Sequence, residues 1–316
     1  MRTSPVLQKS HDINKKPARS PQATLTLFAK GFCMGASDVI PGVSGGTMAL
    51  ILGIYEELIQ SIKAFDGALL RLVLQGRFTQ ALKTAPLGFI LPLGIGILTA
   101  IFTLARGLSW LLESYPVAIW SFFFGLVLAS AIVVGRRIDR WRFSTVIGLL
   151  LSAMGAYILV GLVPVNTPET LPFIFLCGAI AICAMILPGI SGSFILVLLG
   201  KYHFVLNAVG RFDILVLSVF SAGTATGIML FVRILNWLLK RYHQITMAAL
   251  TGLMIGSLRK IWPWKSMTAI ATDGSESGAI MVNIFPQQIN TEVLIAIGLA
   301  LLGGLIVLLM QRLTEE

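Results

Sequence analysis

Long apolar stretches alternate with short polar and basic segments along most of the chain. Six of the stretches are long enough to predict transmembrane helices, because about 20 residues cross the hydrocarbon core of a bilayer. They cover roughly residues 86–105, 116–134, 143–163, 214–235, 244–257 and 292–311, and the stretch at 244–257 is the shortest. The pattern therefore predicts an all-α membrane protein. Glycines at small-xxx-small spacing predict close helix packing; they are Gly31 and Gly35, Gly223 and Gly227, and Gly252 and Gly256.

Two further apolar stretches are each interrupted by the motif Pro-Gly-x-Ser-Gly, at residues 41–45 and 188–192. The helical arms beside each interruption have about 14–16 residues and reach only about 21–24 Å, short of the roughly 30 Å core. Each pair of arms therefore forms either a re-entrant hairpin or one broken crossing helix. The distribution of charge favours re-entrant hairpins, because they place 18 of the 24 Lys and Arg residues on the cytoplasmic side.

The two halves of the sequence resemble each other. The segment DVIPGVSGGTMALILGIY matches MILPGISGSFILVLLGKY without gaps at an offset of 147 residues, and residues 96–130 match 223–257 at an offset of 127 residues. The change of offset predicts an insertion near residues 61–95. With three transmembrane helices and one re-entrant hairpin in each half, the second half enters the membrane from the opposite face. The sequence therefore predicts two inverted repeats, as in many secondary transporters.

This organisation divides the chain into three predicted parts. Residues 1–23 are polar and basic, and we expect a disordered cytoplasmic tail. Residues 24–165 form the first predicted repeat, and residues 166–316 form the second. The charge distribution predicts that both termini are cytoplasmic.

Composition excludes several classes of function. The chain is 56% hydrophobic and 12% charged, with a mean hydropathy of +0.87, which is too apolar for a soluble enzyme. Its net charge of +10 does not indicate a nucleic-acid partner, because the basic residues gather at helix ends. The three cysteines, Cys33, Cys177 and Cys183, lack metal-ligand spacing, and the three histidines form no catalytic pattern. We expect no metal, no cofactor and no catalytic residue.

The two Pro-Gly-x-Ser-Gly motifs are the candidate functional sites. An interrupted helix at membrane depth is tolerated only where it faces protein or a wet cavity, and free N–H groups at the start of a half-helix favour anions. The helix breaks are predicted at Pro41, Gly42, Pro188 and Gly189. The predicted phosphate-binding residues are Ser44, Gly45, Gly46, Thr47, Ser191, Gly192 and Ser193. The alternative for each hydroxyl is simply to cap its half-helix.

Three charged residues extend the candidate sites. Asp38 lies in an apolar arm, where an unpaired carboxylate is costly, and is a candidate site for a coupled proton or sodium ion. A salt bridge to a basic residue is the alternative. Arg106 and Arg233 are related by the repeat, and we predict that they bind phosphate, one near each face. Anchoring at the membrane interface is their alternative role.

Three segments, GASDVIPGVSGGTMALILGIYEELI, ILPGISGSFILVLLGKY and TGLMIGSLRKIWPW, resemble the bacterial polyprenyl-phosphate transporter family. The similarity covers nearly the whole chain after residue 24. By this resemblance, the protein returns undecaprenyl phosphate, the lipid carrier of cell-wall synthesis, from the outer to the cytoplasmic leaflet of the inner membrane. Such a protein needs an anion site for the phosphate and a lateral opening for the lipid tail. We expect alternating access between the two repeats.

Two other functions stay open at this point. A transporter of a small soluble anion would have a closed aqueous path, and a lipid phosphatase would release inorganic phosphate. The sequence does not fix the exact lipid or the coupling ion. Nor does it decide whether the protein, surrounded by membrane lipids, forms a homo-oligomer.

Overall fold

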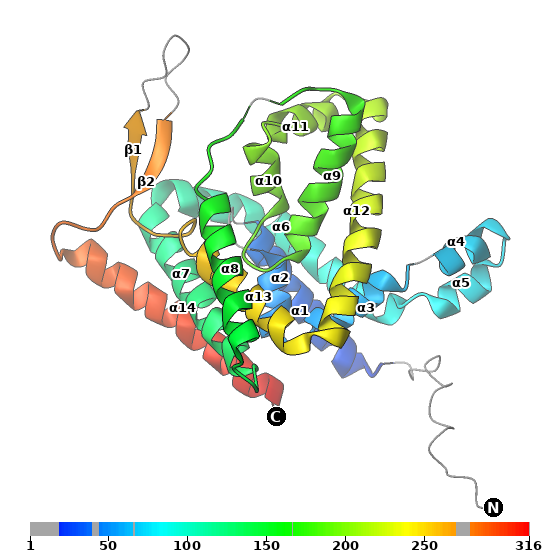
Figure 1. Cartoon of the computed structure of the whole chain (residues 1–316), viewed down its shortest axis with the longest axis horizontal. Helices are drawn as coiled ribbons and strands as arrows, with labels where there is room; N and C mark the ends of the chain where they lie inside the picture. The colour runs from blue at the N-terminus through cyan, green and yellow to red at the C-terminus, as the bar shows by residue number, and fades with distance from the viewer. Residues whose placement is uncertain (1–18, 40–43, 66, 166, 270–278, 316) are drawn as a thin grey trace, which may run out of the picture.

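Helices form almost the whole of the structure (Figure 1), a computed structural model that describes residues 19–39, 44–65, 67–165, 167–269 and 279–315. The helices of the first half are α1 (Pro21–Asp38), α2 (Gly45–Ile51), α3 (Tyr55–Lys63), α4 (Gly67–Leu74), α5 (Phe78–Thr84), α6 (Leu87–Ser114), α7 (Pro116–Arg136) and α8 (Phe143–Leu159). The elements of the second half are α9 (Leu171–Ile186), α10 (Gly192–Leu198), α11 (Tyr202–Gly210), α12 (Ile214–Arg241), α13 (His243–Ser257), β1 (Lys265–Ala269), β2 (Ala279–Asn283) and α14 (Thr291–Glu315).

Helices recur in the same order in the two halves. In each half, one helix of 16–18 residues and two short helices of seven and nine residues precede three helices of at least 15 residues. Helices α10 and α11 begin at the offset of 147 residues from α2 and α3. Helix α12 likewise begins 127 residues after α6. Helices α4 and α5 have no counterpart in the second half and occupy the segment where an insertion was predicted. The predicted tail, residues 1–23, lies mostly outside the described residues, and its last three residues belong to α1.

Local sequence explains where several of these helices begin. The side chain of Ser20 accepts a hydrogen bond from the Ala23 amide at the start of α1, and Asp213 does the same for Val216 at the start of α12. Ser44 and Ser191 cap the two short helices α2 and α10 in the same way. These short polar side chains satisfy amides that have no partner inside the helix, so each helix start is fixed by its own sequence.

Long-range packing joins the halves and confirms the close helix contacts predicted from glycine spacing. Helix α1 packs on α6 and α9 on α12, whereas α7 packs on α14 and α8 on α13. A Cβ atom placed on Gly31 would lie 2.1 Å from the Leu93 carbonyl oxygen, and one on Gly223 would lie 2.0 Å from that of Phe175. The backbones of these pairs therefore approach more closely than any side chain allows.

Four helices are long and apolar enough to cross a membrane, namely Leu87–Ser114, Pro116–Arg136, Ile214–Arg241 and Thr291–Arg312. They correspond to four of the six predicted spans. The other two predicted spans contain α8, of 17 residues, and α13, of 15 residues, which reach only about 22–26 Å at 1.5 Å per residue. The chain is thus a multi-pass helical membrane protein, and α8 and α13 are shorter than the bilayer core.

A two-stranded antiparallel hairpin is the one departure from helical structure within the described residues. Strand β1 pairs with β2 in a register that runs from Lys265 opposite Asn283 to Ala269 opposite Ala279. The sequence analysis did not predict it, because its strands have only five residues each and are too short to stand out beside the apolar helices.

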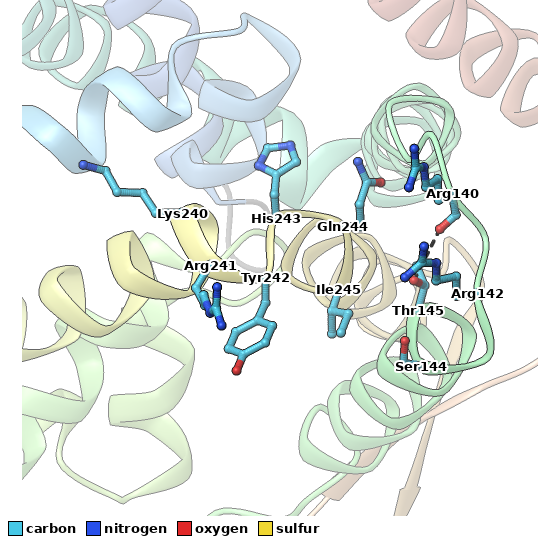
Figure 2. A pocket seen from close by; sticks show the side chains of 10 residues that line it. All are labelled: Arg140, Arg142, Ser144, Thr145, Lys240, Arg241, Tyr242, His243, Gln244 and Ile245. Atoms are coloured by element: carbon cyan, nitrogen blue, oxygen red, sulfur yellow. Dashed lines mark hydrogen bonds between the residues drawn. The ribbon is translucent and has the colours of Figure 1, made fainter. Parts of the chain in front are cut away.

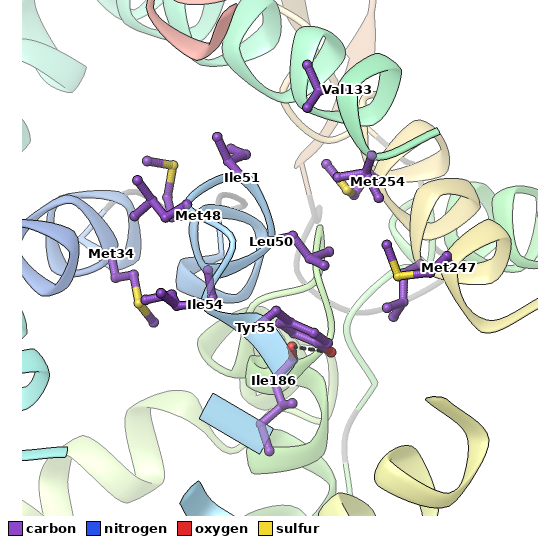
Figure 3. Close-up of a cluster of buried hydrophobic side chains, with 14 of the residues drawn as sticks. Met34, Met48, Leu50, Ile51, Ile54, Tyr55, Val133, Ile186, Met247 and Met254 are labelled. Carbon is purple, nitrogen blue, oxygen red and sulfur yellow. Dashed lines mark hydrogen bonds between the residues drawn. The ribbon is translucent and has the colours of Figure 1, made fainter. Parts of the chain in front are cut away.

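The core of the molecule surrounds α2. Every residue of this helix, Met48 included, is buried, and Met34, Met247 and Met254 belong to the same buried cluster (Figure 3). Methionine side chains are flexible and fill irregular gaps between helices. Ser44 and Gly45, the last two residues of the first Pro-Gly-x-Ser-Gly motif, are therefore buried near the centre of the protein.

Candidate functional site

The start of α2, which follows the first break, is already bonded within the protein. Asp38 accepts a hydrogen bond from the Gly45 amide at 2.6 Å, and the Ser44 hydroxyl oxygen accepts one from the Gly46 amide at 3.1 Å. Pro41 and Gly42 lie outside the described residues. Because its first amides have partners, the predicted anion site at Ser44, Gly45 and Gly46 has few free donors in this conformation.

Hydrogen bonds also connect the first break with the second. The Ser44 hydroxyl donates to the Met185 carbonyl at 3.1 Å, and the Tyr55 hydroxyl donates to the Ile186 carbonyl at 3.3 Å, the bond drawn in Figure 3. In the opposite direction, the Gly189 amide donates to the Thr47 hydroxyl oxygen at 3.0 Å. These three bonds, here called the inter-break contact, bring residues more than 130 positions apart in sequence into one buried cluster.

The second break, in contrast, leaves hydroxyl groups accessible. The Ser191 hydroxyl oxygen accepts a bond from the Phe194 amide and lies 2.6 Å from the hydroxyl of Ser193, which is exposed. Gly189, with φ of +85°, makes the turn before α10 in a conformation that suits glycine. The two predicted sites are therefore unequal, since the first is closed and the second is open.

Cationic side chains lie beside the second break, on the segment that follows α13. The Lys260 ammonium group lies 4.4 Å from the centre of the Phe194 ring, and the Lys265 ammonium group donates to the Lys260 carbonyl at 2.6 Å. Burial lowers the pKa of Lys260; burial, and then the charge of Lys260, lower the pKa of Lys265 to about 8. Within the described residues, neither lysine lies within ion-pair distance of a carboxylate.

Neither predicted arginine contacts a break. Arg106 is exposed on α6, and Arg233 lines an open hollow of about 550 Å³ at the end of α12. A second hollow of about 350 Å³ shares Lys240 and Arg241 with the first (Figure 2). We call the two together the basic hollow; its cations are Lys63, Arg140, Arg142, Arg233, Lys240 and Arg241. No hydrogen bond or ion pair among the described residues joins Arg106 or Arg233 to a break.

Asp38 caps α2 instead of pairing with a cation. Its carboxylate accepts the Gly45 amide, and no Lys, Arg or His nitrogen of the described residues lies within 4.0 Å of it. The alternative role as a salt-bridge partner is thus not the arrangement seen. A carboxylate in such a place can exchange a proton or bind a cation, but it also supports the first break mechanically.

Sequence comparisons identify the known proteins to which this chain is similar. A sequence model for a family described as undecaprenyl phosphate translocase-like matches residues 34–279. The chain is 41% identical over 300 residues to the polyprenyl-phosphate transporter of Vibrio cholerae, an alignment that covers 92% of this chain and 97% of the relative. The chain belongs to the undecaprenyl phosphate translocase-like family. It is also 31% identical over 253 residues to the polyprenyl-phosphate transporter of Staphylococcus aureus, covering 74% of this chain and 84% of that one. No solved structure matches the chain.

Family membership confirms the resemblance given by the three sequence segments. The part of the chain that matches the translocase-like family includes both breaks, the basic hollow, Lys260 and Lys265. Reasoning from sequence did not single out these two lysines, although one signal was present. The positive-inside rule predicts few cations on the outer side, so lysines in the segment RKIWPWK, which the charge distribution predicts to be outside, call for another explanation.

Proposed function

We propose that this protein transports undecaprenyl phosphate from the outer to the cytoplasmic leaflet of the bacterial inner membrane and so recycles the lipid carrier. Both relatives are named polyprenyl-phosphate transporters, which supports the class of substrate. The single observation that carries the mechanism is the inter-break contact. Two interrupted helices from distant parts of the chain meet at the centre of the protein, as expected where a membrane transporter holds its substrate.

The proposed mechanism is alternating access between two inverted repeats. The recurring order of helices in the two halves supports the repeat. Its inversion is supported by Figure 1, where the short helix after the first break, α3, lies toward the lower end of the molecule, and its counterpart α11 lies at the upper end. Two halves that enter from opposite faces can exchange conformations, and this exchange opens the site first to one side and then to the other.

The phosphate is proposed to bind first at the second break, where Ser191, Gly192 and Ser193 are accessible. Residues Ser44 to Thr47 would share it only after the inter-break contact opens, because their groups are otherwise occupied by protein partners. The basic hollow, which contains Arg233, would then attract the head group on the cytoplasmic side. Its six cations favour a dianionic phosphate, and guanidinium groups suit phosphate oxygens in particular.

The same charges support the proposed orientation. In Figure 1 the C-terminus lies at the lower end of the molecule, the end at which α8 and α13 begin, and residues at those helix starts line the basic hollow. The positive-inside rule places such a cluster in the cytoplasm. Both termini are then cytoplasmic, and the second break opens toward the outside.

Asp38 is the proposed coupling residue for a proton or a sodium ion. Its carboxylate sits at the first break and holds α2 through the Gly45 amide. Protonation or cation binding would weaken this bond and loosen the start of α2, so that ion binding and opening of the first break would be linked. The coupling is part of the proposal and is tested separately below.

Leaflet accessibility of undecaprenyl phosphate tests the proposed function. Cells depleted of the protein, in a strain without a redundant carrier, are probed with a head-group-binding reagent that cannot cross the inner membrane. We expect intact lipid phosphate to accumulate on the outer face and to return to its normal level when the wild-type chain is restored. An unchanged outer pool would refute the proposal, and release of inorganic phosphate by the purified protein would indicate a phosphatase instead.

A further inference from the structure

The segment from the end of α13 to the start of β1 carries two lysines, and the first of them, Lys260, lies against the second break. The Lys260 ammonium group contacts the ring of Phe194, and Phe194 is the residue whose amide is capped by Ser191. The Lys265 side chain turns back to the Lys260 carbonyl and lies 4.6 Å from the centre of the Trp120 ring. The segment is itself held in place, since the Trp262 indole donates to the Ile284 carbonyl at 2.8 Å.

Within the described residues, no anionic partner compensates for the burial of these two lysines. Both are only partly exposed, and none of the described carboxylates is within ion-pair distance. A buried ammonium group is costly unless an anion or several hydrogen bonds accompany it. The other partly buried cation that follows α13, Arg259, is already used, because it donates to the Tyr157 carbonyl at 3.0 Å and stacks on the Tyr157 ring.

Several hydrogen-bond donors on Ser191, Ser193 and the two lysines have no acceptor among the described residues. Ser191 and Ser193 share one hydroxyl proton between them, and neither donates to another described group, so one hydroxyl proton is left over. Lys265 spends one of its three N–H donors on the Lys260 carbonyl, and no hydrogen bond is formed by the Lys260 ammonium group within the described residues. These side chains thus offer two positive charges and several free donors, and a phosphate monoester needs both.

We propose that Lys260 and Lys265 bind the phosphate monoester of the substrate beside the second break, together with the hydroxyls there. This site rests on the proposed function and deepens it, because it identifies the groups that capture the head group on the outer side. In the described part of the first break, the hydroxyls of Ser44 and Thr47 and the amides of Gly45 and Gly46 already bond to protein. The Trp120 ring beside Lys265, and Trp262 on the same segment as Lys260, are residues typical of the membrane interface, where such a site would meet a lipid head group.

Direct binding measurements on the full chain in phosphatidylcholine nanodiscs test this site. The probes are undecaprenyl phosphate, inorganic phosphate, undecaprenol and phosphatidylglycerol, which separate the lipid head group from free phosphate, the lipid tail and a phosphodiester. The variants are Lys260→Gln, Lys265→Gln and the charge-retaining Lys260→Arg and Lys265→Arg. Lys83→Gln, an exposed lysine on α5, removes the same charge far from the site.

We expect each Gln variant to bind undecaprenyl phosphate about tenfold more weakly, because each removes a charged hydrogen bond. The Arg variants should stay within about threefold of wild type, and Lys83→Gln should be unchanged. Weaker binding by the Lys260→Gln variant would not be due to misfolding, because the ammonium group of Lys260 makes no hydrogen bond to the described chain. The melting temperature of this variant should match that of the wild-type protein.

The outcomes separate this inference from the proposed function. Unchanged affinity for undecaprenyl phosphate in both Gln variants would overturn the lysine site and leave the transport function standing. Lysine-dependent binding of inorganic phosphate without any binding of undecaprenyl phosphate would support the site and overturn the lipid substrate. Wild-type protein that binds none of the phosphate probes would overturn both.

Discussion

Replacing Thr47 by valine removes one bond of the inter-break contact with almost no change in shape. Thr47 is fully buried on α2, and its hydroxyl oxygen accepts the Gly189 amide at 3.0 Å. Valine fills nearly the same volume, so no cavity forms. The substitution therefore isolates the hydrogen bond between the two breaks from packing effects.

The expected cost follows from the group that is left behind. In the valine variant the Gly189 amide loses its acceptor in a buried place, and an unsatisfied buried donor costs about 1–3 kcal/mol. That is large enough to shift a two-state equilibrium by tenfold or more, since 1.4 kcal/mol corresponds to a factor of ten. We expect a melting temperature lower by a few degrees and a smaller population of the conformation with the first break closed.

Two measurements on the purified protein check this expectation. Thermal unfolding in detergent gives the melting temperature, and deuterium labelling of the backbone amides of α2, with Ser44 left intact, reports whether the first break opens. Thr103→Val is the matched control, because the hydroxyl of Thr103 bonds only to carbonyls of its own helix and its side chain is exposed. If Thr47→Val and Thr103→Val had the same melting temperature and Thr47→Val left the labelling rate unchanged, the bond between Thr47 and Gly189 would not stabilise the closed conformation.

Three further substitutions test separate parts of the structure. Gly227→Ala should lower the melting temperature, because the added Cβ would lie 2.5 Å from the Ala179 carbonyl oxygen and overpacking costs about 1–3 kcal/mol; Gly107→Ala, where nothing lies within 4 Å, should not. Asp38→Asn keeps an acceptor for the Gly45 amide, so the variant should be as stable as the wild-type protein. In proteoliposomes, its transport should no longer depend on a proton or sodium gradient. Arg233→Gln should slow transport by about fivefold through weaker capture at the basic hollow, in a flux assay with reconstituted protein; an unchanged rate would leave Arg233 as an interfacial anchor.

Much of the fold could be predicted because it depends on local sequence and period. Four of the apolar stretches correspond to the long helices, and the serine of each Pro-Gly-x-Ser-Gly motif caps the helix that follows, α2 or α10. Glycine spacing predicted the close helix pairs for a physical reason, since only a residue without a side chain lets two backbones touch. The shortest predicted stretch, at 244–257, does correspond to the short helix α13. The β-hairpin and the short length of α8 were harder to predict, because hydropathy marks apolar segments but not where a helix ends.

The candidate site could be predicted less well, because its properties depend on contacts between distant segments. The two motifs look equivalent in sequence, but Ser44 is buried against Met185 whereas Ser191 stays accessible. Nothing in the sequence near Asp38 shows that its carboxylate bonds to Gly45. The role of Lys260 likewise depends on a ring contact with Phe194, 66 positions away, which no local pattern contains.

Chemical differences between the repeats bear on the proposed transport cycle. If the two repeats exchanged conformations completely, the second break would close through the symmetry-related counterpart of the inter-break contact. Ser191 and Tyr202 would then take the places of Ser44 and Tyr55. The position equivalent to Thr47, however, is Phe194, whose side chain cannot accept a hydrogen bond. The Lys260 ammonium group lies over the Phe194 ring instead. The opposite state must therefore lack one bond of the contact. A phosphate held between both breaks could supply acceptors for the amides left unpaired. The proposed substrate would then stabilise this opposite state, which has fewer bonds between the breaks than the state described here.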